Sequence, residues 1–477
     1  MTQRNTTPSE PSFGLALGTF LVIVGVIGIG LFVLKVSLHS LMLICLIIAA
    51  GSAWSLYKGG FAPIREAMNA GITRAFSAIY IFILIGVLIA AYIQSGTVAA
   101  LIYYGLEFIL PTVFLPAGLI LCSFMSVATG TSWGTVGTAG VVLIGVGSAM
   151  NIPLPVVAGM VVSGAVFGDK MSPISDTTNL AAMSAKTDLY SHIKSMLFTT
   201  GPAYLIALGV YTYLGLSYSD NAMPEETIQT MLNAIDQTFS INLICLLPLL
   251  VLLGLSFKRV SAEPAMMISA VVALLIAVMM QGKECDAALS ALWSGDKPQT
   301  GVASLDSLLS RGGISSMGWT LFLSLQALAL GGILAEFGFL RVLIAGIVGG
   351  VKRRASLVAA TIISCVVGNM SMGEAYMSII LGGQLYGHAY DDKDIDRSVL
   401  SRSLEEGATL STPLIPWTTG GAFFAATLNV PTLDYLPYAF VNLINPIIAI
   451  LFAYLGVALF RAKKAHANGA AEPSART

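Results

Sequence analysis

Residues 168–179 read Gly-Asp-Lys-Met-Ser-Pro-Ile-Ser-Asp-Thr-Thr-Asn and form a dense polar segment. They place two carboxylates, an ammonium, four hydroxyls, an amide and a proline within one short stretch. Upstream, Glu107 is the only charged residue between Arg74 and Asp169. Ionisable groups are costly inside a bilayer and are kept there mainly for function. The segment therefore predicts a functional interruption of a membrane-spanning helix.

The composition of the surrounding chain is that of a membrane protein. Of its 477 residues, 56% are hydrophobic and only 10% are charged, whereas soluble domains carry about 25% charged residues. Apolar windows of about 20 residues recur, which is the length that a helix needs to cross a bilayer. They lack the strict alternation of barrel strands. We predict an all-α, polytopic membrane protein.

Apolar windows and polar stretches divide the chain into six regions. The first apolar run, from Leu15 to Leu34, is too long for a typical signal-peptide core and is expected to be a retained span. Two shorter apolar segments, 98–110 and 338–350, are expected to be re-entrant or interfacial hairpins. The predicted regions are a polar tail (1–13), two spans (14–71), a first transport repeat (72–217), connecting loops with two spans (218–316), a second transport repeat (317–460) and a disordered cytoplasmic tail (461–477).

Several motifs of the first half return in the second half about 240 positions later, which indicates an internal repeat. Ser172-Pro173 is echoed by Thr412-Pro413, and Thr177-Thr178 is echoed by Thr418-Thr419. Glycine, proline and hydroxyl clusters of this kind interrupt helices. Each repeat is therefore expected to contain broken helices.

Positively charged residues predict the orientation of the chain. Lys58 and Arg74 follow the second span, and Lys258 and Arg259 mark another loop, so both loops should be cytoplasmic. The acidic loop 218–237 should lie outside. Both termini are then cytoplasmic, and the two repeats have inverted topology, as in many secondary transporters.

The polar interruptions supply candidate site residues. Unwound backbone at membrane depth is tolerated only where it is buried in protein or lines a wet cavity, and hard cations prefer oxygen ligands. The candidate cation ligands are Asp169, Ser172, Asp176, Thr177, Thr178 and Asn179. The candidate pathway residues are Thr129, Thr131, Ser132, Asn369, Ser371, Glu374, Thr412, Trp417, Thr418 and Thr419.

The two aspartates are the leading candidates for carrying the exchanged ions. A poorly solvated carboxylate holds either a proton or a metal cation, and this competition is the minimal mechanism of proton–cation exchange. Lys170 is expected to pair with Asp169 and to hold the broken helix in place. Asp176 has no such neighbour in the sequence and is the stronger candidate for the exchanged ion.

Structural roles compete with these functional ones. Asp176 is also a candidate cap for the helix that follows, and many membrane hydroxyls only satisfy helix backbone. Glu405 and Glu406 follow Arg402, and we expect them to form a surface pair beside a loop.

Two other function classes were considered. Residues 130–134, Gly-Thr-Ser-Trp-Gly, match the nucleophile elbow of serine hydrolases, so an intramembrane serine hydrolase is a remote alternative. That reading needs a strand before Ser132 and a base beside it, and no histidine lies centrally in a span. A passive channel is disfavoured by the inverted halves. The five cysteines are scattered without metal-binding spacing, so no cofactor is expected and the protein is not predicted to be an enzyme.

The motifs resemble a known family. Residues 168–181 are similar to the signature of the NhaC family of Na⁺/H⁺ antiporters, and residues 129–138 resemble its preceding motif. The segments 401–406, 412–420 and 431–438 resemble the C-terminal half of that family. The likeness extends over most of the chain, from about residue 15 to residue 460.

The resemblance implies a bacterial inner-membrane secondary transporter of the ion-transporter superfamily that exchanges Na⁺ for H⁺. Similar proteins couple these ions to organic solutes such as malate and lactate, or carry amino acids, and this alternative stays open. The expected partners are sodium ions, protons and the lipid bilayer, with a small carboxylate or amino acid as the alternative cargo. No nucleic acid is expected, and a homodimer is left open.

Overall fold

The computed structural model describes residues 10–57, 60–74, 76–108, 110–219, 225–258 and 260–461. Within these ranges the chain is helical and contains no β-strand, which confirms the all-α prediction. Most of the predicted polar tail (1–9) and the predicted C-terminal tail from residue 462 lie outside the described residues, as do Lys58, Arg259 and residues 220–224 of the acidic loop.

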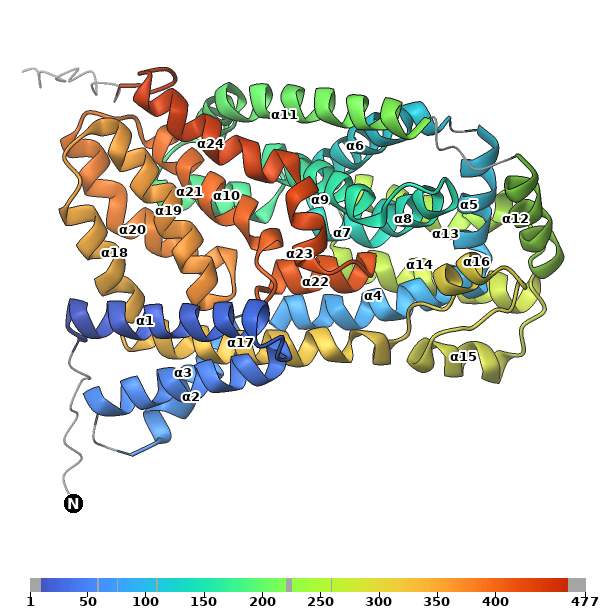
Figure 1. The fold of residues 1–477 in the computed structure, drawn as a ribbon, viewed down its shortest axis with the longest axis horizontal. Coiled ribbons are helices and arrows are strands. Elements are labelled where there is room, and N and C mark those ends of the chain that lie inside the picture. Colours follow the sequence, from blue (N-terminus) through green and yellow to red (C-terminus); the bar gives the residue numbers. More distant parts are fainter. Residues whose placement is uncertain are drawn as a thin grey trace, which may run out of the picture.

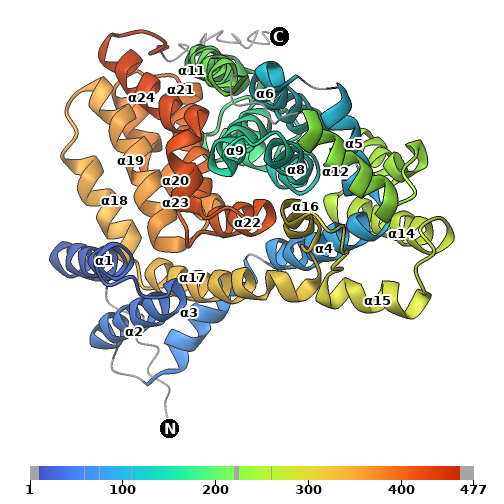
Figure 2. The same ribbon diagram turned by 45° about the vertical axis from the view of Figure 1, so that its right-hand side comes forward.

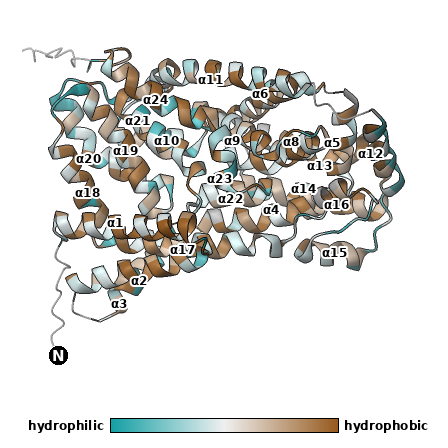
Figure 3. Cartoon of the chain, viewed as in Figure 1, coloured by the Kyte–Doolittle hydropathy of each residue, from teal (hydrophilic) through white to brown (hydrophobic). Residues whose placement is uncertain are grey.

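The described helices have the lengths of a polytopic membrane protein. Nine of them are long and apolar enough to cross a bilayer, or up to twelve if each sharply bent pair is one span. Large apolar side chains such as Leu21, Phe124 and Leu205 are exposed on them, as lipid-facing surfaces require. Figure 3 shows hydrophobic residues along these helices and more hydrophilic ones around α12 (Glu225–Thr238).

The first half of the molecule contains two interrupted helices in sequence (Figure 1). Its helices are α4 (Phe76–Gln94), α5 (Thr97–Phe108), α6 (Pro111–Thr129), α7 (Ser132–Thr135), a π-helical turn (Val136–Gly140), α8 (Val141–Ala149), α9 (Leu154–Met171), α10 (Asp176–Ala185) and α11 (Leu189–Ser219).

The second half has the same order of elements. Its helices are α17 (Gly318–Glu336), α18 (Phe339–Gly349), α19 (Arg354–Met372), α20 (Ala375–Asp392), α21 (Arg397–Ser411), a 3₁₀ turn (Thr412–Leu414), α22 (Thr419–Leu428), α23 (Thr432–Tyr435), a 3₁₀ turn (Leu436–Tyr438) and α24 (Phe440–Tyr454).

The remaining helices precede and connect the two halves. They are α1 (Phe13–Gly28), α2 (Leu38–Leu56), α3 (Ala62–Thr73), α13 (Leu247–Phe257), α14 (Ala262–Met279), α15 (Cys285–Ser294) and α16 (Ala303–Leu309). The residues Pro224-Glu225-Glu226 predicted the first turn of a short surface helix, and α12 begins at Glu225. Helices α15 and α16 lie in a stretch where the sequence indicated only connecting loop.

The helix ends of the two halves correspond at one constant spacing along the chain. Gly130 ends α6 and Gly373 ends α19 in the left-handed conformation, with φ values of 71° and 68°. Lys186 and Asn429 end α10 and α22 in the same way. This correspondence supports the internal repeat. The inverted orientation of the halves and the domain boundaries stay predictions.

The second piece of each broken helix packs into the opposite half. Helix α10 packs against α20 and α21, while α22 packs against α7, the 136–140 turn and α8. Figure 2 shows α22 reaching from the second-half helices towards α8 and α9. The interruptions of both halves are therefore brought to one interface.

Helix α3 lies where the sequence indicated only a loop. It packs along α17, and Gly71 meets Gly332 so closely that a Cβ atom on Gly71 would lie 2.8 Å from the Gly332 Cα atom. Only glycine allows this approach. The contact fixes Arg74, at the end of α3, beside Glu336 of α17, with which it forms an ion pair.

Candidate functional site

A cavity of about 710 Å³ lies between the two halves, where the four helix interruptions meet. The structure brings many of the predicted site residues to its wall. These are Thr129, Thr131, Ser132, Asp169, Asp176, Thr177, Glu374, Thr412 and Thr419. The geometry thus joins the two sets of interruptions into one site, while the ion-binding role of these residues stays a prediction.

The other predicted site residues do not line this cavity. They are Ser172, Thr178, Asn179, Asn369, Ser371, Trp417 and Thr418. Each donates a hydrogen bond to at least one backbone carbonyl near an interruption, as the next two paragraphs describe. Interrupted helices leave carbonyl groups without intrahelical partners, so these side chains stabilise the broken backbone.

In the first half, three side chains satisfy carbonyls around the α9–α10 interruption. Ser172 donates from Oγ to the Val127 carbonyl oxygen at 2.8 Å, and Thr178 donates from Oγ1 to the Lys170 carbonyl oxygen at 3.0 Å. Asn179 donates to the carbonyl oxygens of Pro173 and Ser175. The predicted role of these three side chains as cation ligands stays a prediction.

In the second half, four side chains act in the same way. Asn369 donates to a carbonyl of α21 at 2.7 Å, and Ser371 donates to a carbonyl of its own helix at 2.7 Å. Trp417 donates from Nε1 to the Met370 carbonyl oxygen at 2.9 Å. Thr418 donates from Oγ1 to the Ile415 carbonyl oxygen at 2.8 Å, and it caps α22 by accepting a hydrogen bond from the Gly421 amide.

Asp169 is nearly buried in the last turn of α9, and its carboxylate connects the two interruptions of the first half. Ser132 donates to Oδ2 from its amide at 3.1 Å and from Oγ at 2.6 Å. Ser175 donates to Oδ1 from Oγ at 2.5 Å. The carboxylate is therefore held in place by neutral donors at the cavity wall.

The predicted pair between Lys170 and Asp169 is wrong. The Lys170 ammonium lies 3.9 Å from Oε1 of Glu406 in α21 instead. Adjacent residues of a helix point about 100° apart, so Lys170 is directed into the interface with α21 while Asp169 is directed to the cavity. The sequence argument that favoured Asp176 over Asp169 therefore loses its basis.

Asp176 is exposed at the cavity wall and begins α10. Asp176 was expected to cap this helix, but the residue at the cap position is Ser175. Asp176 is instead the first residue of the helix. A carboxylate there is favoured by the partial positive charge of the helix N-terminus. The neighbouring Thr177 hydroxyl lies 3.1 Å from the Ser175 hydroxyl.

Glu374 connects the two interruptions of the second half. It caps α20, and its Oε1 accepts a hydrogen bond from the Ala375 amide at 2.9 Å. Its Oε2 accepts a hydrogen bond from the Thr419 hydroxyl at 2.6 Å. The Thr419 amide also donates to the Gly373 carbonyl at 2.9 Å, so the two interruptions are joined by side chain and backbone.

Sequence reasoning missed Tyr376, which lines the cavity from the first turn of α20. Its phenol lies within electrostatic range of Glu374, Asp176, Asp169 and Glu405. Its place two residues after Glu374, directly after a helix break, was the available signal in the sequence.

Carboxylates in the described residues do not converge in groups of three. No set of three histidine, cysteine, aspartate or glutamate side chains in the described ranges could hold one metal ion. A cation at this wall would therefore be bound by one or two carboxylates together with hydroxyl and carbonyl oxygens. That ligand set suits a hard cation of low charge.

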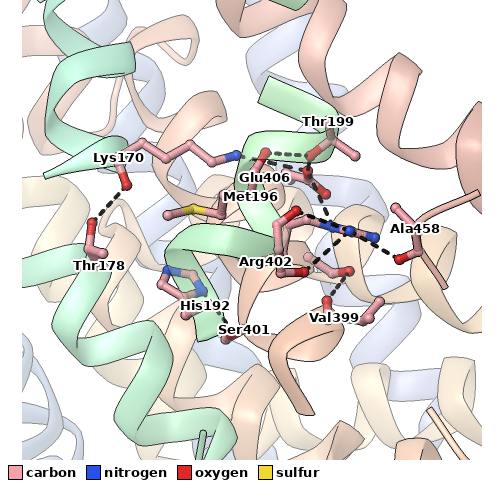
Figure 4. A network of polar contacts seen from close by, with 12 residues as sticks. Lys170, Thr178, His192, Met196, Thr199, Val399, Ser401, Arg402, Glu406 and Ala458 are labelled. Carbon is pink, nitrogen blue, oxygen red and sulfur yellow. Dashed lines mark hydrogen bonds and ion pairs between the residues drawn. The ribbon is translucent and has the colours of Figure 1, made fainter. Parts of the chain in front are cut away.

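A fully buried charged cluster adjoins the cavity (Figure 4). The Glu406 Oε1 atom lies 3.9 Å from the Lys170 Nζ atom and 3.7 Å from the Arg402 Nε atom, and it accepts a hydrogen bond from Thr199. Glu405 is buried as well. The expectation of a surface pair is wrong because α21 is enclosed by α11, α19 and α20. The Arg402–Glu406 spacing along one helix was the signal in the sequence.

The geometry around Ser132 differs from a nucleophile elbow. The segment before it is helix α6, whereas an elbow follows a strand. The Ser132 hydroxyl donates to Asp169, and the Nδ1 atom of the buried His192 bonds with Ser401 at 2.7 Å. Ser132 therefore acts as a donor to the cavity carboxylate.

Comparison with known proteins agrees with this geometry. A family model described as the Na⁺/H⁺ antiporter family matches residues 6–178 and 164–457. The chain belongs to this family. The resemblance to NhaC is confirmed as well, because a protein named Na⁺/H⁺ antiporter NhaC from Alkalihalophilus pseudofirmus is 37% identical over 450 residues, which cover 94% of this chain and 96% of that protein.

Relatives named for other transport activities are almost as similar. A malate-2H⁺/Na⁺-lactate antiporter of Bacillus subtilis is 37% identical over 396 residues, covering 83% of this chain and 85% of that protein. An arginine/ornithine antiporter, ArcD, of Halobacterium salinarum is 33% identical over 451 residues, which cover 94% of this chain and 93% of that protein. With the long apolar helices, these matches identify a multi-pass membrane protein of an antiporter family.

Proposed function

We propose that the protein exchanges Na⁺ for H⁺ across the bacterial inner membrane. The observation that carries this proposal is Asp169, a nearly buried carboxylate at the cavity wall that is held by neutral donors from Ser132 and Ser175. A carboxylate in such a place binds a proton or a cation, and the two compete. Membership of the Na⁺/H⁺ antiporter family supports these two ions as the cargo.

The proposed ion site combines residues of both halves. Asp169, Asp176 and Thr177 contribute from the first half, while Glu374 and Thr419 face them across the cavity from the second half. Sodium is bound there by carboxylate and hydroxyl oxygens, without a resident cofactor. Proton binding at the same carboxylates releases it.

The residues at the mouth of the cavity support a cytoplasmic opening. Its wall includes Arg74 and residues 260–263, which adjoin the two loops that the charge distribution places in the cytoplasm. If these loops are cytoplasmic, the cavity opens to the cytoplasmic side of the membrane. Alternating access would then require the broken helices α10 and α22 to shift within the opposite halves that hold them.

One observation favours a second candidate function, exchange coupled to an organic solute. The cavity volume of about 710 Å³ falls within the range of about 300–1,000 Å³ that is typical of small-molecule sites. Its wall also contains the aromatic side chains of Trp133, Tyr376 and Phe424. The relatives named as malate–lactate and arginine–ornithine antiporters are consistent with such a cargo.

Purified protein in proteoliposomes that contain a pH-sensitive dye distinguishes the two functions. We expect a Na⁺ gradient alone to drive proton movement, with protein-free liposomes as the control. A strict requirement for added malate, lactate or arginine would favour solute exchange. Absence of proton movement with Na⁺ under every condition would contradict Na⁺/H⁺ exchange.

A further inference from the structure

Glu405 is a buried carboxylate whose oxygens have no hydrogen-bond partner of normal geometry among the described residues. Its neighbour Glu406 is different, because it accepts a hydrogen bond from Thr199 and forms ion pairs with Lys170 and Arg402. Lys170 attracts Glu405 electrostatically, but its ammonium lies beside Glu406 instead, and a buried carboxylate without a close partner is costly. Glu405 therefore needs another positively charged or donating partner.

The surroundings of Glu405 are rich in oxygen atoms and lie next to the cavity. The hydroxyls of Thr177 and Thr409 are in range of its carboxylate, and both threonines line the cavity. Thr409 stands one helical turn after Glu405, and its Oγ1 atom also has no hydrogen-bond partner among the described residues. Thr177 and Thr409 therefore lie between Glu405 and the cavity.

A series of oxygen atoms leads from Asp169 towards Glu405. The Asp169 Oδ1 atom accepts the Ser175 hydroxyl at 2.5 Å, and the Ser175 hydroxyl lies 3.1 Å from that of Thr177. Thr177 in turn faces Glu405, and Asp169 interacts electrostatically with Glu405. The two carboxylates therefore flank one group of hydroxyls.

The formal charges of this region leave room for one monovalent cation. This region holds three carboxylates, those of Glu406, Glu405 and the adjoining Asp169, and two fixed cations, those of Lys170 and Arg402. Both fixed cations are directed to the same oxygen of Glu406. One negative charge is left over on the side of Asp169 and Glu405, where net charge is costly in a medium of low dielectric constant.

We propose that Glu405 is a ligand of the transported cation, which it holds together with Asp169 and the hydroxyls of Thr177 and Thr409. This inference rests on the proposed function, since it assigns a further ligand to the same Na⁺ site. It places the bound cation at the inner wall of the cavity, against α21 of the second half, so that both halves hold it. The sequence-based ligand set, drawn from residues 169–179, lacked this contribution.

Equilibrium binding of ²²Na⁺ to the purified full-length protein at one fixed alkaline pH tests the proposal. Glu405→Gln keeps the size of the side chain and removes its charge, and we expect Na⁺ affinity to fall by about tenfold or more. Glu405→Asp keeps the charge but shortens the side chain, so the preference for Li⁺ over Na⁺ should change. A merely structural role would not alter that preference.

Thr409→Val provides a second variant if Glu405→Gln does not fold. It should lower Na⁺ affinity by about fivefold, because one neutral ligand is lost. Thr427→Val is the matched control, since the Thr427 hydroxyl is equally buried and without a partner but does not line the cavity. We expect it to bind Na⁺ as the wild type does.

The outcomes separate this inference from the proposed function. Wild-type Na⁺ affinity and ion preference in the folded Glu405 variants, or wild-type affinity in Thr409→Val, would overturn the role of Glu405 while leaving Na⁺/H⁺ exchange intact. Failure of the wild-type protein to bind Na⁺ would overturn both. Equal losses in Thr409→Val and Thr427→Val would also overturn the inference, because the loss would then reflect packing.

Discussion

At the α6–α7 interruption the chain turns through Gly130 and caps the next helix with Thr131, while at the α19–α20 interruption it turns through Gly373 and caps the next helix with Glu374. The backbone geometry of the two places is the same. Their chemistry differs, because a hydroxyl performs the capping in the first half and a carboxylate does so in the second.

At the α9–α10 and α21–α22 interruptions the carboxylates belong to the first half and the hydroxyls to the second. Aligned on their helix ends (130 with 373 and 186 with 429), the halves pair Asp169 with Thr412 and Asp176 with Thr419. The structure thus corrects the pairing of Ser172 with Thr412 that the sequence indicated. Wherever one half presents a carboxylate to the cavity, the other presents a hydroxyl at the equivalent position. The repeated backbone builds the cavity, and the unequal side chains give each half a different task within it.

Replacement of the first-half carboxylate should have the largest effect. Asp169→Asn keeps the shape of the side chain and removes its charge, so we expect Na⁺-driven proton movement in proteoliposomes to be abolished. Thr412→Val, at the equivalent position, loses an uncharged hydroxyl that donates to the Ala408 carbonyl and accepts a hydrogen bond from Asn369. Transport should then fall by less than about fivefold. Equal loss in both variants would mean that the two positions share one role.

The two turning glycines should differ in their effect on stability. A Cβ atom at Gly130 would lie 2.7 Å from the Ile174 side chain, whereas at Gly373 its nearest neighbour would be Ala327 at 3.1 Å. Both alanine variants lose about 1 kcal/mol from the left-handed backbone, and Gly130→Ala should lose about 1–3 kcal/mol more from crowding.

Thermal unfolding in detergent measures this difference. Gly254→Ala is the control, because Gly254 lies in α13 with no atom within 4 Å of the added Cβ, and it should unfold at the wild-type temperature or slightly above. A lower unfolding temperature for Gly373→Ala than for Gly130→Ala would contradict the prediction.

Glu374→Thr gives the second-half cap the residue type of the first half. Threonine retains the capping of α20, but the bond to Thr419 and the cavity charge are lost. We expect the rate of Na⁺-driven proton movement to fall by about tenfold, as loss of a charged ligand implies. A wild-type rate in a correctly folded variant would show that the second half contributes structure alone.

The smallest effect is expected for Trp417, which the sequence placed in the ion pathway. Trp417→Phe removes the hydrogen bond to the Met370 carbonyl and should cost about 1 kcal/mol of stability. Transport at saturating Na⁺ should be unchanged, because the side chain does not line the cavity. A clear change in the Na⁺ concentration needed for half-maximal transport would show that Trp417 contributes to the ion pathway.

The interruptions were predictable because they depend on local chemistry. Glycine at 130 and 373 and proline at 173 and 413 mark helix ends by their own backbone preferences, and the spacing of about 240 residues between these motifs revealed the repeat. The cavity residues Asp169, Asp176 and Glu374 followed from their position beside such breaks.

The environment of α21 was not predictable in this way. Its charged residues resemble those of a surface helix, and no pattern within the helix shows that α11, α19 and α20 enclose it. The partner of Lys170 lies in the other half of the chain. Such pairings depend on how the halves are placed together, which a single sequence does not encode locally.

The exchange of α10 and α22 between the halves also has a consequence for biogenesis. Helix α10 is complete at Ala185, but the helices that receive it, α20 and α21, are complete only when synthesis has passed Ser411. During synthesis, α10 therefore lacks its packing partners in the second half until most of the chain has been made. Contacts of such long sequence separation form slowly, so the ion site should be the last part of the protein to mature.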